Sequence, residues 1–187
     1  MDSYIELQLL PDPEFPATTL MNALFAKLHR GLVSNGEGRI GISFPVVASK
    51  EPGLGSRLRL HGQAVDLEKL MALNWLQGMR DHLSVGAIST VPVNASYRIV
   101  RRVQAKSSPE RERRRLVARK GITPEAAVLA IPDSAAESLT LPYLLLTSQS
   151  TQQQFRLFIE HRPLQDQPAS GLFNAYGLSA GATIPWF

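Results

Sequence analysis

The 187-residue sequence has no cysteine and no long apolar run. Without cysteine, disulfide frameworks, cysteine metal sites and thiol nucleophiles are excluded, and a reducing compartment is favoured. The longest apolar stretch, Leu141 to Leu146, has six residues and contains a proline, so it is too short to cross a membrane. The first residues also lack the basic and apolar regions of a secretory signal. We therefore expect a cytoplasmic protein with no membrane partner.

Acidic residues are scarce in one short part of the chain. Residues 101–120 carry nine Lys or Arg and two acidic residues, a local net charge of +7 in a chain whose total is +4. The remaining residues therefore sum to −3. A positive charge that is concentrated in this way predicts a polyanionic partner, because it creates one strong local field.

This basic stretch has the features of a helix over residues 108–120. Ser108 suits the N-cap and Pro109 the first helical position, and the two acidic residues lie at the positive end of the helix dipole. Leu116 and Val117 would face the body of the protein. At about 100° per residue, four arginines fall on the opposite side within an arc of roughly 140°; they are Arg111, Arg114, Arg115 and Arg119. Such a row favours bidentate contacts with phosphates and bases, so nucleic acid is the expected ligand.

Hydrophobic periodicity predicts an α+β protein with two domains. The order β-α-β-β-α-β over residues 1–94 is that of a ferredoxin-like domain. A linker at 92–96 then leads to a second α+β domain over 95–187, which contains the arginine-rich helix 108–120. The individual elements expected are strands at 4–10, 39–44, 57–61 and 84–91, helices of about 18 residues from Leu20 and over 67–79, a helical segment near 123–138, a hairpin at 141–149 and 154–161, and a last strand at 172–178.

Motifs for cofactors and metals are missing or misplaced. Gly36 to Gly41 matches GxGxxG, but it follows a helix and opens a strand, the reverse of a dinucleotide-binding loop. The four histidines lie far apart, and the acidic residues do not cluster with them. We therefore expect no cofactor and no metal ligands, and any nuclease chemistry is expected to be metal-free.

A few single residues are candidates for RNA chemistry. His29 lies on the rim of the apolar stripe of its helix, where it could reach a cleft or could only complement the helix dipole. Arg102 and Gln104 would point the same way on an extended segment and suit base edges. Phe155 could stack on a base or belong to the core. Ser148, which ends a strand, and Tyr176, which precedes a glycine, have ordinary structural explanations when considered alone.

Taken together, these segments resemble a known family, the CRISPR repeat-cleaving endoribonucleases of the type I-F (Yersinia) subtype. The similarity extends over essentially the whole chain, and its motifs occur in the family's order. The segments that carry it are Leu10-Pro11-Asp12-Pro13-Glu14-Phe15-Pro16, Lys27-Leu28-His29, Arg102-Val103-Gln104-Ala105-Lys106-Ser107 with the arginine-rich helix, Ser148-Gln149-Ser150-Thr151, Phe155-Arg156-Leu157-Phe158-Ile159, Tyr176-Gly177-Leu178-Ser179 and Pro185-Trp186-Phe187.

The resemblance implies metal-independent cleavage at the base of a hairpin in the CRISPR repeat RNA. In this family, the residue matching His29 acts on the ribose 2′-OH, that matching Ser148 holds the ribose, and that matching Tyr176 orients the histidine. The arginine-rich helix docks in the major groove of the hairpin. The RNA-binding residues implied are Arg102, Gln104, Ser107, Arg111, Arg114, Arg115, Arg119, Lys120, Ser150, Thr151 and Phe155. Ala118 departs from the family, which often has a basic residue there.

The expected reaction is attack of the 2′-OH on the adjacent phosphate, which leaves a 2′,3′-cyclic phosphate and a 5′-hydroxyl. Family analogy further implies that the product stays bound and that other subunits of a type I-F surveillance complex are partners. Two alternatives remain: a non-catalytic RNA-hairpin-binding subunit, and a DNA-binding regulator, which the lack of a helix-turn-helix pattern makes less favourable.

Overall fold

The computed structural model describes all residues except 36, 48–52, 105–108 and 133–138. The chain divides into two compact units. Unit 1 comprises residues 1–102 and 141–187, and unit 2 comprises residues 103–140. Both helices and antiparallel sheets are present, so the expected α+β class is confirmed.

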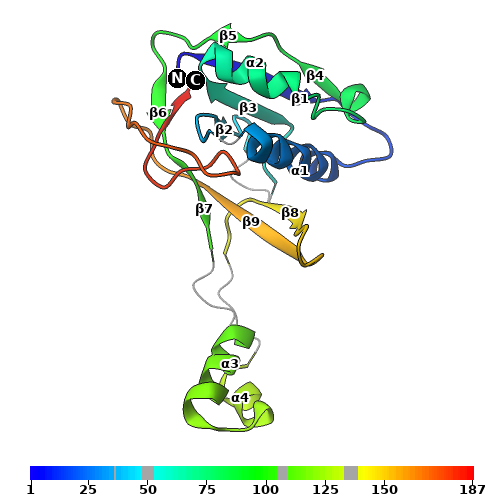
Figure 1. Ribbon diagram of the computed structural model, residues 1–187, viewed down its shortest axis with the longest axis vertical. Helices are drawn as coiled ribbons and strands as arrows, with labels where there is room; N and C mark the ends of the chain where they lie inside the picture. The colour runs from blue at the N-terminus through cyan, green and yellow to red at the C-terminus, as the bar shows by residue number, and fades with distance from the viewer. Residues whose placement is uncertain (36, 48–52, 105–108, 133–138) are drawn as a thin grey trace. The chain divides into compact units, whose positions relative to one another are not determined.

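Unit 1 is built around an antiparallel sheet with strand order β2-β3-β1-β4, and β5 also pairs with β1. Its first elements follow the order β-α-β-β-α-β of a ferredoxin-like fold. They are β1 (Ser3–Leu9), α1 (Ala17–Asn35), β2 (Gly41–Ser43), β3 (Arg57–Gly62), α2 (Ala64–Ala72) and β4 (Leu83–Val85), with β5 (Ser89–Thr90) following (Figure 1).

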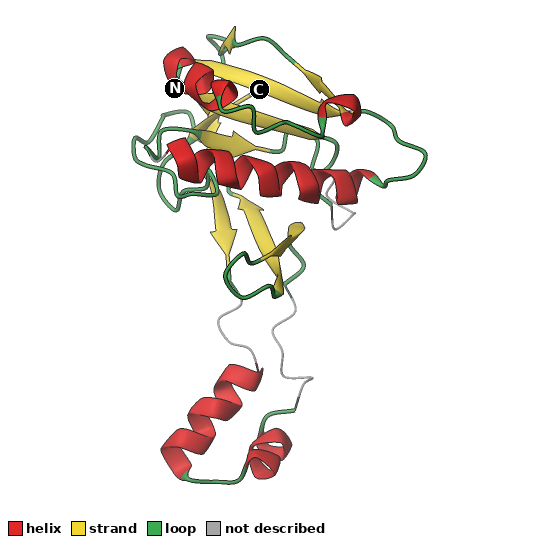
Figure 2. Ribbon diagram, turned by 45° about the vertical axis from the view of Figure 1, so that its right-hand side comes forward, coloured by secondary structure: helices red, strands yellow, loops and turns green. Residues whose placement is uncertain are grey.

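Strict alternation in β1 places its apolar side chains on the helix-covered side of the sheet. Ile5, Leu7 and Leu9 are buried in the same core cluster as the buried face of α1 and as Leu67 and Leu70 of α2. Figure 2 shows the long helix α1 beside the strands of this sheet. Because side chains on a strand alternate between faces, the polar residues of β1 lie on the other side. The core therefore fixes the rotation of α1, and with it the direction in which its rim residues point.

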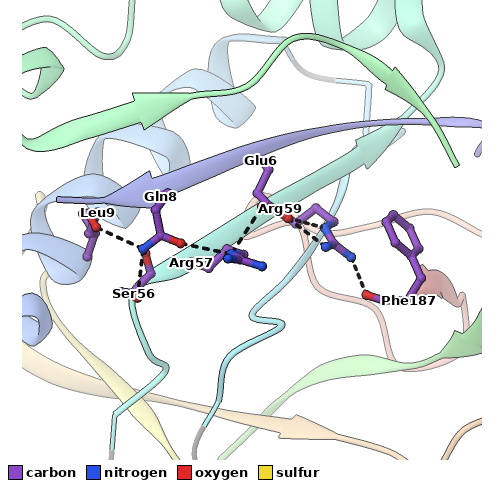
Figure 3. Close-up of polar contacts among 7 residues, drawn as sticks. All are labelled: Glu6, Gln8, Leu9, Ser56, Arg57, Arg59 and Phe187. Carbon is purple, nitrogen blue, oxygen red and sulfur yellow. Dashed lines mark hydrogen bonds and ion pairs between the residues drawn. The ribbon is translucent and has the colours of Figure 1, made fainter.

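The opposite side of the sheet carries a polar network (Figure 3). Glu6 of β1 forms an ion pair of 2.7 Å with Arg59 of β3, and Gln8 accepts a 3.0 Å hydrogen bond from Arg57. The Arg59 guanidinium lies 4.0 Å from the ring centroid of Phe187 and donates to its carbonyl oxygen at 2.9 Å. These contacts hold the chain after the last strand against β3.

Two smaller sheets complete unit 1. Strand β6 (Ser96–Arg98) pairs with β10 (Ile184–Trp186), and a second sheet has the order β7-β9-β8. The strands of this second sheet are β7 (Val100–Val103), β8 (Tyr143–Thr147) and β9 (Gln154–His161). Leu144, Leu157 and Ile184 are buried in the same core as the first sheet. The compact units therefore have bounds other than 1–94 and 95–187, because apolar residues from both predicted ranges share one core.

Unit 2 contains α3 (Pro109–Lys120) and α4 (Pro124–Ala130). Gly121 follows α3 with a φ of +63°, which favours glycine, and Thr123 caps α4 by accepting a 3.2 Å hydrogen bond from the Ala126 amide. Ala127 is buried, whereas no described side chain of α3 is. The arginine-rich helix is confirmed over the described residues, and Ser108 lies outside them.

Four predicted elements differ from the structure. The helical segment expected near 123–138 ends at Ala130, and residues 133–138 lie outside the described residues. The expected helix over 67–79 ends at Ala72, because Asn74 and Gly78 adopt positive φ values and the chain enters turns before the short 3₁₀ helix Arg80–His82. The expected strand at 84–91 is split into β4 and β5. The expected strand at 172–178 is wrong: this stretch forms a turn, and the last strand is β10. In the part of the chain that the structure describes, no helix has the length and apolar character needed to span a bilayer.

Candidate functional site

His29 is held by a main-chain carbonyl and an aromatic ring. Its Nδ1 lies 2.8 Å from the carbonyl oxygen of Ala175, and its ring stacks on that of Tyr176 at 4.3 Å between centroids and 10° between planes. A carbonyl can only accept a hydrogen bond, so Nδ1 carries the proton when the imidazole is neutral. Nε2 then has a free lone pair and is the atom that can accept a proton from a substrate.

The carbonyl of Ala175 belongs to a tight turn after Phe173. Asn174 Oδ1 accepts hydrogen bonds from the amides of Tyr176 at 2.8 Å and Leu178 at 3.3 Å. Gly177 adopts a φ of +71°, and its carbonyl accepts from the Ile42 amide at 3.0 Å. A Cβ atom at Gly177 would lie 2.7 Å from Ile42 Cγ2, so the turn and β2 fit closely only with glycine here.

Ser148 begins the loop that joins β8 to β9. Its amide donates to Gln153 O at 2.9 Å, its hydroxyl accepts from the Thr151 amide at 3.3 Å, and Ser148 Oγ lies 3.2 Å from Ser150 Oγ. The hairpin is tied to α1 because Asn22 Oδ1 accepts a 3.0 Å hydrogen bond from the Leu145 amide. Asn22 and His29 are seven residues apart and so share a helix face, which places the serine loop beside the histidine.

These segments enclose a cavity of about 280 Å³. Five of the predicted site residues line it together: His29, Ser148, Ser150, Phe155 and Tyr176. The other lining residues are Ala26, Arg30, Leu146, Thr147 and Gln149. All of them are described, and together they include one permanent cation, Arg30, and no carboxylate. A cavity of this composition suits an anionic ligand.

Arg102 borders the same site. Its guanidinium lies 6.0 Å from the ring centroid of Phe155 and 5.6 Å from that of Tyr176. Among the described residues, its Nε atom is buried and has no hydrogen-bond partner. Thr151 does not line the cavity, and it contributes through the hydrogen bond from its amide to Ser148.

The other predicted RNA-binding residues lie outside unit 1. Arg111, Arg114, Arg115, Arg119 and Lys120 are exposed on α3. Leu116 and Val117 are partly buried within unit 2. Arg113 donates to the carbonyl of Ile131 at 2.7 Å and so links α3 to the end of α4. Gln104 is exposed, and Ser107 lies outside the described residues.

Sequence reasoning missed Arg30, Asn22 and Asn174. The adjacency of Arg30 to His29 was a usable signal for a cavity cation, and the seven-residue spacing of Asn22 was a signal for a shared helix face. Asn174, three residues before a glycine, is typical of a turn that is closed by an asparagine side chain. The bond from Asn22 to the distant Leu145 had no signal in the sequence.

Two further histidines have strongly lowered pKa values but do not line this cavity. Burial lowers the pKa of His61 to about 3, helped by the nearby Arg59 charge. Burial likewise lowers the pKa of His161 to about 4, with a contribution from Arg98. Both are therefore neutral parts of the fold near neutral pH. No group of three His, Asp or Glu side chains that could hold a metal ion occurs among the residues described here.

Comparison with known proteins identifies the family. Residues 4–187 match the Cas_Csy4 family of CRISPR-associated proteins. The chain is 52% identical over its full 187 residues to the CRISPR-associated endonuclease Cas6/Csy4 of Pseudomonas aeruginosa strain UCBPP-PA14, covering 100% of that protein. It is 47% identical, again with full coverage of both chains, to the CRISPR-associated endonuclease Cas6/Csy4 of Escherichia coli strain UTI89. The chain therefore belongs to the Cas_Csy4 family, which confirms the resemblance carried by its motifs.

Proposed function

We propose that this member of the Cas_Csy4 family is an endoribonuclease that cleaves CRISPR precursor transcripts at the base of the repeat hairpin, giving mature guide RNAs. The relatives named above are endonucleases, which supports this class of reaction. The observation that carries the proposal is the pairing of His29 Nδ1 with the Ala175 carbonyl beside a serine-lined cavity. That arrangement leaves Nε2 as a proton acceptor where a ribose can bind.

In the proposed reaction, His29 Nε2 accepts the proton of the 2′-OH upstream of the scissile bond. The O2′–P bond forms and the P–O5′ bond breaks, and the leaving 5′ oxygen takes up a proton. The products are a 2′,3′-cyclic phosphate and a 5′-hydroxyl, so charge and atoms balance without a metal ion. General-base catalysis of this kind contributes about 10²- to 10⁴-fold in rate.

The other cavity residues position the substrate. The Ser148 hydroxyl holds the ribose, with Ser150 beside it at 3.2 Å, and Tyr176 keeps the histidine ring in its plane by stacking. Arg30, the permanent cation among the lining residues, offsets the negative charge that develops on the phosphate. Alignment of the 2′ oxygen, phosphorus and leaving oxygen supplies much of the remaining acceleration.

Recognition is divided between charge and base contacts. The exposed arginines of α3 bind phosphates of the hairpin stem, and a short stem is required because the major groove of continuous A-form RNA is too narrow for side chains. Arg102 and Gln104 read bases at the foot of the stem, and Phe155 stacks beneath its last pair, where each stacked base contributes about 1–3 kcal/mol. Ser107, Lys120 and Thr151 add contacts to the RNA. The product remains bound and joins other subunits of a type I-F surveillance complex.

A cleavage assay in EDTA tests this function directly. The substrate is a repeat hairpin from a CRISPR array of the source genome, and the control is the same RNA with one 2′-deoxy nucleotide at the scissile position. We expect the first to be cut and the second only to be bound. Cutting of the deoxy substrate would exclude attack by the 2′-OH, and binding without cutting of either RNA would indicate a non-catalytic hairpin-binding subunit.

A further inference from the structure

We propose that Asn174 is a positioning residue for His29: it fixes the turn whose carbonyl selects the proton-accepting form of the imidazole. This inference rests on the proposed endoribonuclease function. Asn174 itself does not line the cavity of His29 and Ser148, so it acts through the turn that follows it.

Asn174 makes four hydrogen bonds within five residues. Its side-chain oxygen accepts from the amides of Tyr176 at 2.8 Å and Leu178 at 3.3 Å. Its main-chain amide donates to Leu178 O at 2.9 Å, and its carbonyl accepts from the Gly177 amide at 2.8 Å. The side chain thus satisfies two main-chain donors that the backbone of the turn leaves free.

The turn needs this side chain because Asn174 and Ala175 are not held by packing. Asn174 and Ala175 are both exposed, between the buried Phe173, whose amide donates to Gly38 O at 2.8 Å, and the contacts made by Tyr176 and by the Ile42 amide with Gly177 O. The Ala175 carbonyl, 2.8 Å from His29 Nδ1, therefore takes its direction from the asparagine bonds on either side of it. Without them, the carbonyl is free to turn, and His29 can place its proton on Nε2, which removes the lone pair that accepts from the 2′-OH.

The first test compares Asn174→Ala with Asn174→Asp in single-turnover cleavage of the repeat hairpin. Loss of two neutral hydrogen bonds corresponds to a rate that is about tenfold lower for the alanine variant, with the affinity for the uncleaved hairpin changed less than about twofold. The aspartate variant keeps an acceptor oxygen in the same place and should restore the rate to within about threefold. Asn94→Ala, at an exposed asparagine of the linker, is the matched control and should cleave normally.

The second test is independent of RNA. Nitrogen-15 NMR of the histidine ring in the free protein should show His29 with its proton on Nδ1 in the wild type and a mixture of both tautomers in Asn174→Ala. The proposal is overturned if the alanine variant keeps both the wild-type rate and the wild-type tautomer, or if the aspartate variant is as slow as the alanine variant. If the wild-type protein does not cut RNA, while NMR still shows different His29 tautomers in the wild type and in Asn174→Ala, the proposed function is refuted instead.

Discussion

The two compact units differ in how their important side chains are held. In unit 1, His29 is fixed by a hydrogen bond, a stacked ring and a helix whose other face is fully buried. In unit 2, four of the five arginines of α3 are exposed, and none of the described side chains of that helix is buried. Proton transfer requires atoms placed within a few tenths of an ångström, whereas attraction to phosphates tolerates long, mobile side chains. We therefore expect substitutions in unit 1 to affect mainly cleavage and substitutions in unit 2 to affect mainly binding.

The largest effect is expected for His29→Ala. Removal of the proton acceptor should lower the single-turnover cleavage rate by at least about 10²- to 10⁴-fold. The affinity for the hairpin should stay within about threefold, because the proposed phosphate contacts lie on α3. Rates from denaturing gels and affinities from filter binding provide both numbers, and an equal loss of cleavage and binding would contradict the assignment of this residue.

The reverse effect is expected for Arg114→Ala combined with Arg115→Ala. Each phosphate contact that is removed should lower the slope of log affinity against log salt concentration by about one, so the pair should lower it by about two. Cleavage of RNA that is already bound should change little, since neither residue belongs to the cavity around His29. Binding titrations from low to high salt measure the slope. Arg80→Ala, which removes an exposed arginine of unit 1, is the control and should leave the slope unchanged.

We expect acid to destabilise unit 1 more than unit 2. His61 and His161 are neutral near neutral pH in the folded protein, with pKa values of about 3 and about 4, below the ordinary histidine value of about 6.5. Unfolding lets both bind protons, so stability is full above pH 6.5 and falls as the pH drops toward 4. At pH 5, each of these two histidines lowers the free energy of unfolding by roughly 1 to 2 kcal/mol. Unit 2 contains no histidine, so its helices lack this source of destabilisation in acid.

Circular dichroism can follow this difference, because both tryptophans, Trp75 and Trp186, belong to unit 1. Their near-ultraviolet signal should be lost at a higher pH than the helical signal of unit 2. His161→Gln removes one titrating group and should shift the acid midpoint of unit 1 downward. A midpoint that does not move would show that the burial of His161 does not destabilise the protein in acid.

Sequence periodicity predicted those parts of the fold in which one face is buried. Residues of α1 such as Leu24 and Leu28 recur at helical spacing, and the same pattern located His29 on the rim of that helix. The apolar Phe173 and Leu178 suggest a strand by pattern, although their burial comes from separate contacts on either side of the turn at 174–178. Local pattern carries no information about such contacts.

Convergence of the site residues could be inferred only through family resemblance. Ala175 meets His29 across 146 positions of sequence, and Leu145 meets Asn22 across 123. Neither pair shows a periodic signal, because each contact depends on how separate strands and loops pack against α1. The structure places His29, Ser148 and Tyr176, which the resemblance named, around one cavity, whereas the resemblance had nothing to say about Asn174.

The long separation between His29 and its carbonyl partner also orders events during protein synthesis. The ribosome completes the arginine-rich helix at residue 120 well before it reaches Ala175 and Tyr176. A growing chain therefore contains the whole arginine-rich helix while the histidine still lacks the partners that orient it.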